Sequence, residues 1–365
     1  MASLMGPSAR GKLSRLLPSF LHLRDYCHAA AMENYLYHPK SRPLEPEVQT
    51  LNLTKTLHMG EISSCLQDIV IDAATRESMM PKFRQNIIQT RLINFDGEIA
   101  TRDKCALPLM QNMLRVVWSS TNCFPGLLET SLTYKPHVSA YWEREHKIQV
   151  GGHVGFLLSS KNQLKQVADS QEVKKTKEIE VEKPDIISPL FHLNTSKKTN
   201  PKFETGFYNN SPFPYPHTFI MVCEDIKQNT SQLVGQGIMF SCARLVADAV
   251  QKRNYQIGDE LEKPLATQCI LTDGIRLTFI HYQLNTLSFS DDGGIKNMAW
   301  ISPGVFMYKR IVFDDIEKRE KTAKERKRFR RAKKDPAKHE IVLEDFNDEC
   351  FETFVKMIVS GCHAS

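Results

Sequence analysis

The sequence lacks the cysteine spacing on which most metal centres depend. Its nine cysteines include no CxxC pair, and the two nearest, Cys350 and Cys362, are 12 positions apart. Zinc ribbons and iron–sulfur centres need clustered thiolates, so neither is predicted. An odd number of cysteines, scattered through apolar segments, is typical of reduced thiols packed as small hydrophobic side chains. The pattern favours a reducing compartment over a secreted disulfide-bonded scaffold.

Recognisable catalytic motifs are also missing. The chain has no HExxH, no nucleophile elbow and no phosphate-binding glycine loop. Gly235-Gln236-Gly237 fails as a dinucleotide fingerprint, because Phe240 stands where the third glycine should be. The 12 histidines are scattered, so no cofactor and no metal site is predicted. One catalytic alternative stays open, a hydrolase whose site includes Asp273 and His281.

Long apolar runs are absent as well, and none approaches the roughly 18 residues of a membrane span. The 365 residues, 41% of them hydrophobic and 25% charged, suit one large folded domain or two. The net charge of +6 comes from one segment, 318–334, which has 11 basic and only two acidic residues. Without it, 37 basic and 40 acidic residues remain. The charge pattern predicts a nearly neutral body that carries a basic arm, 317–335, for a polyanionic partner.

The first residues, 1–31, are basic, contain serines, and have no acid before Asp25. Leucines and a phenylalanine recur there at helical spacing, a pattern typical of mitochondrial import. The alternative is an unstructured basic terminus. Segment 32–50 follows as an extended leader, because Pro39, Pro43 and Pro46 should prevent a helix.

The body is predicted to have an α+β fold, with antiparallel hairpins forming a mixed sheet packed by helices. Its first half, 51–158, should contain helices at 62–73, 83–93 and 109–118 and a hairpin at 138–150 that Gly151 and Gly152 close. The next segment, 159–184, is rich in lysine and glutamate and is expected to be a solvated helix or loop.

The second half, 185–316, is predicted to centre on a hairpin whose turn is Asp273-Gly274. Its first strand should begin after Pro264, since proline cannot sit inside a central ladder. In the return strand, Leu277 and Phe279 should face one way and Ile280 and Tyr282 the other. Other expected elements are a strand at 219–222, a helix at 238–252, a strand at 306–313, and a closing helix in 340–361 that docks on the hairpin sheet.

Several short strings carry a resemblance to a known family. The turn at Asp273, the string 283–286 (QLNT) and the string 294–300 (GIKNMAW), at this spacing, resemble large-subunit mitochondrial ribosomal protein thirty-seven. The strings 53–56 (LTKT), 141–145 (YWERE) and the proline–aromatic pairs at 212–217 also match that family. A sister family, mitochondrial ribosomal protein thirty or programmed cell death protein nine, shares the turn and QLNT.

The resemblance implies a non-catalytic structural constituent of the mitochondrial large ribosomal subunit. It also implies contacts with large-subunit rRNA and ribosomal proteins, including the sister protein. A free assembly factor is the alternative. The motif residues expected to be structural are Pro214, Tyr215, Pro216, His217, Asp273, Gly274, Gln283, Asn285, Lys296, Asn297 and Trp300.

In a ribosomal setting the basic arm is predicted to bind RNA phosphates rather than to be a solvated charged helix. His217 should bond a backbone group or an RNA phosphate, with a catalytic base as the alternative. The predicted RNA contacts are Lys318, Arg319, Lys321, Lys324, Arg326, Lys327, Arg328, Arg330, Arg331, Lys333 and Lys334.

Overall fold

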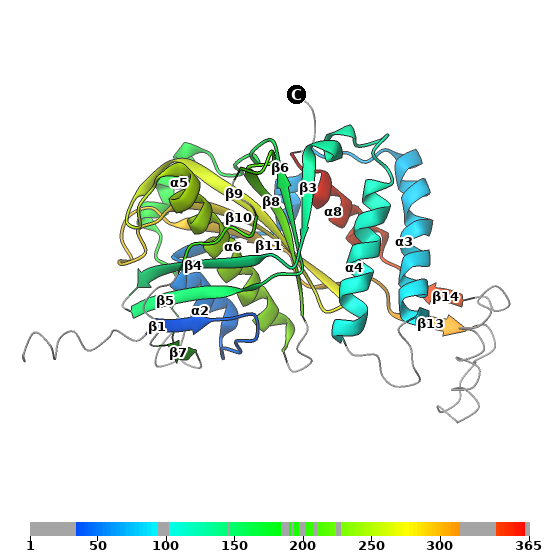
Figure 1. The fold of residues 1–365 in the computed structure, drawn as a ribbon, viewed down its shortest axis with the longest axis horizontal. Helices are drawn as coiled ribbons and strands as arrows, with labels where there is room; N and C mark the ends of the chain where they lie inside the picture. The colour runs from blue at the N-terminus through cyan, green and yellow to red at the C-terminus, as the bar shows by residue number, and fades with distance from the viewer. Residues whose placement is uncertain are drawn as a thin grey trace, which may run out of the picture.

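The structure, a computed structural model, describes residues 34–93, 102–144, 146–183, 190, 193–196, 202–207, 210–223, 228–313 and 341–361 (Figure 1). The predicted targeting segment and the predicted basic arm lie outside these ranges. The described chain has an α+β fold, as the sequence predicted, with a large mixed sheet, a small sheet, and helices on both faces of the large one.

The large sheet has the strand order β2-β11-β10-β9-β8-β6-β3, and β12 pairs with β10. The pairs β2–β11 and β8–β9 are parallel, whereas β9–β10 is the long antiparallel hairpin that the sequence predicted. The strands are β2 (Thr56–Gly60), β3 (Thr130–Tyr134), β6 (Phe156–Ser160), β8 (Tyr215–Val222), β9 (Glu260–Thr272), β10 (Arg276–Thr286), β11 (Asn297–Ile301) and β12 (Val305–Phe306). Because β3 and β6 come from the first half of the chain, the two halves share one sheet.

The small sheet has the order β4-β5-β1-β7. The predicted hairpin of β4 (His137–Arg144) and β5 (His146–His153) forms one side of it. Strands β1 (Asn34–Tyr37) and β7 (Asn194–Ser196) extend the sheet beyond β5. Gly151 and Gly152 lie inside β5 instead of closing the hairpin. Gly152 is needed there because an added Cβ would lie 2.4 Å from Cδ of Pro39, which packs directly on this strand.

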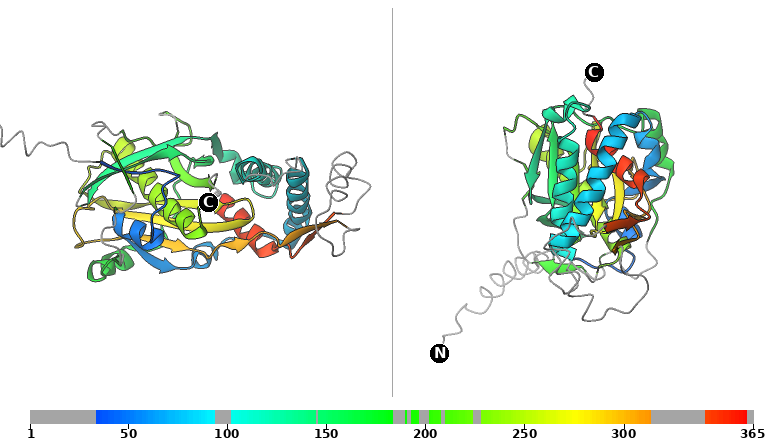
Figure 2. Two further views of the ribbon diagram at one scale, coloured as in Figure 1. Left: turned by 90° about the horizontal axis from the view of Figure 1, so that it is seen from below. Right: turned by 90° about the vertical axis from the view of Figure 1, so that its right-hand side faces the viewer.

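Helix α6 (Thr230–Arg253) lies between the two sheets (Figure 2). It begins eight residues before the predicted start, because Asn229 and Gln232 form a capping box. In length and composition α6 could cross a membrane, yet 94% of its apolar window is buried inside the protein. The helix therefore serves as the core of the fold, and it connects the parallel strands β8 and β9.

Helices α3 (Ala73–Ile93), α4 (Arg102–Trp118) and α8 (Asp348–Val359) cover the opposite face of the large sheet (Figure 1). The alternation along β10 separates the two faces. Leu277 and Phe279 pack with these three helices, whereas Ile280 and Tyr282 pack with α6. The predicted alternation and the docking of the closing helix are both confirmed.

Two expectations for the N-terminal part are wrong. The leader contains β1 and the start of helix α2 (Pro46–Leu53), which Pro46 begins because the first helical position needs no N–H. The helix expected at 62–73 is a short 3-10 turn, η1 (Ile62–Leu66), and α3 starts only at Ala73. Helices α3 and α4 are longer than predicted, and a second 3-10 turn, η2 (Pro125–Glu129), precedes β3.

The charged insert 159–184 is packed against the body rather than solvated. It contains helix α5 (Ser170–Lys175), which Asp169 caps, and the 3-10 turn η3 (Thr176–Glu178). Its lysines and glutamates point outward, while four spaced apolar side chains are buried. These are Leu164, Ala168, Val173 and Val181.

Three boundaries in the second half also differ from prediction. Pro264 lies inside β9, where the register with β10 shifts between Leu284 and Thr286, so a bulge accommodates the missing N–H. Strand β8 starts at Tyr215 rather than at 219. The single strand expected at 306–313 is divided into β12 and β13 (Arg310–Phe313), and β13 pairs with β14 (Ile341–Glu344), which the sequence did not predict.

Candidate functional site

Four of the family-motif strings meet in one buried place, at the end of β10 and the start of β11. They are 53–56, 141–145, 283–286 and 294–300. Asn297 joins them there. Its Oδ1 accepts the backbone N–H groups of Asn285 at 2.8 Å and Thr286 at 3.0 Å, and its Nδ2 donates to the Thr54 carbonyl at 3.0 Å. Asn285 in turn donates from Nδ2 to the Lys296 carbonyl at 2.8 Å. We call Thr54, Lys55, Gln283, Asn285, Lys296 and Asn297 the polar junction.

Gln283 connects the polar junction to the charged insert. Its Oε1 accepts the N–H groups of Val167 at 3.0 Å and Ala168 at 3.1 Å, and its Nε2 donates to the Ala168 carbonyl at 3.2 Å. Gln283 is fully buried. A single amide side chain therefore satisfies both backbone groups of Ala168 and holds the insert on the sheet. Trp300 supports the same contact by packing with Ala168 and Val173.

Two lysines of the polar junction are buried, which is uncommon unless each ammonium finds acceptors. Lys55 donates to the Ser288 carbonyl at 2.9 Å and to Asp291 at 3.2 Å. Lys296 donates to the Lys177 carbonyl at 3.1 Å, and desolvation, then the charge of Lys55, lowers its pKa. Both ammonium groups bind loop carbonyls of this chain, so neither is available as an RNA contact.

The YWER string closes the polar junction from the small sheet. The Trp142 indole donates to the Leu53 carbonyl at 2.9 Å, and Arg144 donates to the Phe289 carbonyl at 2.9 Å and pairs with Asp292. Desolvation acts to raise the pKa of the Asp292 carboxyl, but hydrogen bonds from Lys183 and Arg144 hold this pKa below its usual value. Strings that are far apart in the sequence thus fix one another's positions.

His217, at the start of β8, is completely buried. Its Nε2 bonds the Ser360 carbonyl just after α8, and its Nδ1 lies 2.8 Å from the Thr218 hydroxyl. Burial lowers the pKa of His217 to about 4. The expected bond to a backbone group is confirmed. An RNA phosphate cannot reach a ring with no exposed surface, and a base would need access to substrate.

The proline–aromatic pairs before His217 hold the end of α6. The Pro214 carbonyl accepts from Lys252 at 3.4 Å, the Arg253 guanidinium lies 5.4 Å from the Tyr215 ring, and Pro216 is paired opposite Ser159 of β6. Pro214, Tyr215 and Pro216, which were predicted to be structural, therefore all contact residues of the same chain.

Asp273 and His281, the pair behind the hydrolase alternative, are not brought together. Asp273 caps the hairpin turn by accepting the N–H groups of Ile275 at 2.9 Å and Arg276 at 2.8 Å. His281 lies opposite Gln268, four residues along the ladder from the turn-closing pair, or about 13 Å away. Asp273 lines a cavity of about 510 Å³ with Arg276, and His281 does not line it.

Gly274 completes this turn for two reasons. Its φ of +87° favours glycine, and an added Cβ would lie 3.0 Å from the Cβ of Ala106 in α4. The last ladder pair is Thr272 with Leu277, so the connection is longer than the expected two-residue turn.

His281 is 97% buried, and neither ring nitrogen has a hydrogen-bond partner. Its ring lies edge-on to Trp300, with 5.9 Å between ring centroids. Desolvation, with a smaller contribution from His217, lowers the pKa of His281 to about 4. The imidazole is therefore neutral and packed as an apolar group.

The described residues contain no group of three or more His, Cys, Asp or Glu side chains placed to hold a metal ion. Sequence reasoning missed one cluster that the fold assembles on the surface, His38, Lys40, Lys135 and His153 around a cavity of about 380 Å³. Each of these residues is ordinary in its local sequence, so no local signal could have revealed the cluster.

Comparisons with known proteins agree with the motif strings. A family model described as "Mitochondrial 28S ribosomal protein S30 (PDCD9)" matches residues 223–361, from the end of β8 to the end of α8. The protein named "Large ribosomal subunit protein mL37" from Rattus norvegicus is 27% identical over 283 residues, which cover 76% of this chain and 67% of that protein.

Relatives from other vertebrates give nearly the same result. The mL37 protein of Bos taurus is 27% identical over 290 residues, with the same coverage of each chain, and that of Gallus gallus is 26% identical over 284 residues, or 75% of this chain and 65% of that protein. These alignments extend well beyond the part matched by the family model. The chain is therefore similar to mL37 over 76% of its length and to the named family model over residues 223–361.

Proposed function

We propose that this chain is a non-catalytic structural constituent of the mitochondrial large ribosomal subunit, located in the mitochondrial matrix. The observation that carries the proposal is the alignment with mL37 over 76% of the chain. The family model is described by a 28S protein name, but it matches only residues 223–361. We follow the longer alignments, all of them to proteins named for the large subunit.

The polar junction supports a structural role. Gln283, Asn285 and Asn297 use their side-chain amides on backbone groups of the same chain. Catalytic side chains instead need access to a substrate. The motif residues thus join the insert, the segment 53–56 and the two sheets, which suits a protein whose function depends on its shape.

In this proposal the folded body contacts neighbouring ribosomal proteins, including the sister protein of the family. The basic arm at 317–335 neutralises phosphates of the large-subunit rRNA. Its 11 basic residues contact the backbone of RNA without reading its sequence.

Sedimentation tests the proposal directly. A mitochondrial lysate is washed in high salt, separated on a sucrose gradient and blotted for this protein. Salt removes proteins held by phosphate contacts alone, since their affinity falls by orders of magnitude. We expect the protein to stay with the large subunit. Its recovery only in the free fractions, or only with assembly precursors, would reject the role of a permanent constituent.

Neutralising the arm should weaken its contribution without unfolding the body. We expect replacement of Lys324, Arg326, Lys327, Arg328, Arg330 and Arg331 by Gln to reduce binding to large-subunit rRNA. The slope of log affinity against log salt should fall by about 4, from six contacts at roughly 0.7 each. The measurement is a salt titration of RNA binding, with thermal unfolding as a check on the fold.

A matched control distinguishes the effect of the arm residues from the effect of the change in net charge. Its six Lys→Gln changes fall on exposed lysines of the body, and the salt slope should not change. These are Lys82, Lys161, Lys165, Lys174, Lys202 and Lys263. Equal slopes in the arm variant and the unmodified protein would remove the arm from the proposal.

A further inference from the structure

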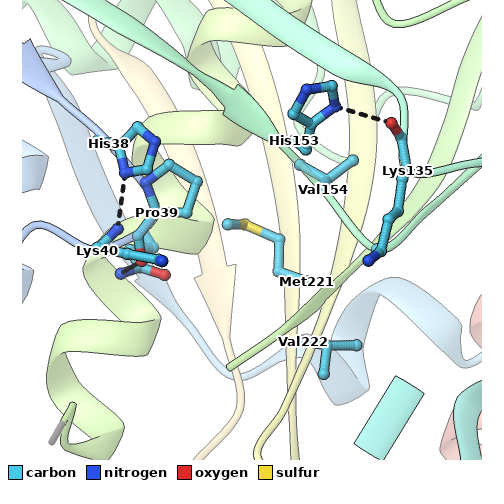
Figure 3. A pocket seen from close by; sticks show the side chains of 10 residues that line it. His38, Pro39, Lys40, Lys135, His153, Val154, Met221 and Val222 are labelled. Carbon is cyan, nitrogen blue, oxygen red and sulfur yellow. Dashed lines mark hydrogen bonds between the residues drawn. The ribbon is translucent and has the colours of Figure 1, made fainter. Parts of the chain in front are cut away.

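A cavity of about 380 Å³ opens between the leader and the end of the small sheet (Figure 3). One wall is the turn at residues 38–41, in which the Ser41 N–H donates to the His38 carbonyl at 2.8 Å. Two glutamines, Gln228 and Gln236, donate to the Pro39 carbonyl and anchor this turn. His38 and Lys40 are therefore presented on a fixed backbone rather than on a free leader.

His38 has a defined tautomer when it is neutral. Its Nδ1 accepts the Lys40 N–H at 3.2 Å, so the proton of the neutral ring is on Nε2. Burial, then the charges of Lys40, His137 and His153, lower the pKa of His38. These neighbours are cationic or can become so, which marks the site as electropositive. An anion would relieve this repulsion and accept from Nε2.

The opposite wall is the connection that carries Lys135 and the end of β5. Lys135 has a φ of +45°, in the left-handed region that non-glycine residues adopt at a cost of about 1 kcal/mol or more. Its N–H donates to the Gly155 carbonyl at 2.9 Å, and its carbonyl accepts from Nδ1 of His153 at 2.9 Å. The strained backbone is thus held from both sides, and Lys135 reaches toward the cavity floor (Figure 3).

The floor between these walls is apolar. Val154, Met221 and Val222 form it, and Met221 lies at its centre between His38 and Lys135 (Figure 3). No carboxylate is found among the described residues that line the cavity. The nearby carboxylate of Glu204 pairs with His137 and lines a neighbouring cavity instead.

We propose that this cavity binds one nucleotide unit. Lys40, Lys135 and the Nε2–H of His38 bind its phosphate, because charge-assisted bonds from opposite walls suit a tetrahedral anion. The base lies on the Met221–Val222 floor, where the imidazole rings of His38 and His153 offer surfaces for stacking. The cavity has the volume of about one nucleotide, which is small for a duplex and larger than phosphate alone requires.

The same chemistry could come from a single-stranded RNA segment or from a free mononucleotide. An RNA source would deepen the proposed ribosomal function, on which that choice rests. The proposal that the cavity binds a nucleotide does not depend on the ribosomal function, because binding is measured on the isolated full-length chain. A failed sedimentation experiment would reject the ribosomal role and leave this binding result to be judged separately.

The test is fluorescence anisotropy with a labelled single-stranded uridine octamer, with uridine monophosphate and inorganic phosphate as competitors. The full-length chain is used both unmodified and with the six arm residues changed to Gln, so that arm binding does not mask the cavity. In the arm variant we expect Lys40→Gln with Lys135→Gln to weaken octamer binding about tenfold. The salt slope should fall by about 1.4, for two phosphate-neutralising lysines.

The control variant carries Lys82→Gln and Lys165→Gln, two exposed lysines that do not line the cavity. It has the same net charge as the cavity variant and should bind like the parent. A 4-thiouridine octamer should crosslink to peptides that contain Met221, His153 or Lys135. If uridine monophosphate displaces the octamer, the ligand is a free nucleotide. If the octamer binds and uridine monophosphate does not displace it, the ligand is single-stranded RNA.

Three results would overturn the assignment. The cavity variant could bind the octamer as tightly as the control variant does. The crosslinks could fall entirely on other parts of the chain. Inorganic phosphate could compete as well as uridine monophosphate, which would mean that the floor binds no base.

Discussion

Replacing Asn297 by Ala should lower the free energy of unfolding by about 4 kcal/mol. The side chain is fully buried and bonds three backbone groups, the N–H of Asn285, the N–H of Thr286 and the carbonyl of Thr54. Alanine leaves all three backbone groups without a partner, and each unpaired buried group costs about 1–3 kcal/mol.

Urea unfolding measures this loss, and we expect the midpoint to fall by roughly 1 M or more. Asn162→Ala is the control, because Asn162 is exposed and should change stability by no more than about 0.5 kcal/mol. Asn297→Asp separates the two halves of the amide, since it keeps the acceptor, removes the donor to Thr54 and buries a charge. A loss below about 1 kcal/mol in Asn297→Ala would show that the polar junction does not hold these strands together.

The parts of the fold that depend on local pattern could be predicted from sequence. The two hairpins follow from alternation and turn residues, and the closing helix follows from its apolar face and the glycine after it. Pro264 and Pro46 misled the prediction for a shared reason. Proline has no N–H to donate, and neither a bulge nor the first turn of a helix needs one at that position. Sequence alone does not show where the bulge lies or where the helix starts.

Long-range placement could not be predicted in the same way. That β1 pairs with β5, or that the charged insert docks on Gln283, depends on contacts between residues more than 100 positions apart. The expectation that the motif residues are structural stays a prediction, and the contacts between three of the strings became visible only at Asn297. The cavity cluster was missed because its histidines and lysines are close only in space.

Lowering the pH from 7.5 to 5.5 should destabilise the protein by about 2.6 kcal/mol through two buried histidines. Burial lowers the pKa values of His217 and His281 from 6.5 to about 4. In the unfolded chain both rings regain the ordinary value, so the unfolded state binds protons first as the pH falls. Proton linkage then gives a loss of about 1.3 kcal/mol for each histidine over this range.

The direction of this effect follows from which state holds the protons. Stability contributed by the neutral rings is fully present above pH 6.5, declines as the pH falls, and stops declining near pH 4, where the folded rings also protonate. His38 is exposed, and its pKa is also lowered, so it adds a smaller change of the same sign. Carboxylates with lowered pKa values, such as Asp72, titrate below this window and do not contribute to it.

Urea unfolding at several pH values tests the prediction, and His281→Leu is the decisive variant. Because neither nitrogen of His281 has a partner, leucine leaves no hydrogen-bonding group unpaired and should cost little stability at pH 7.5. It should, however, remove about half of the pH dependence. His146→Gln, at an exposed position, should leave the pH dependence unchanged. An equal slope in His281→Leu and the unmodified chain would mean that His281 is already protonated, or exposed, in the folded protein.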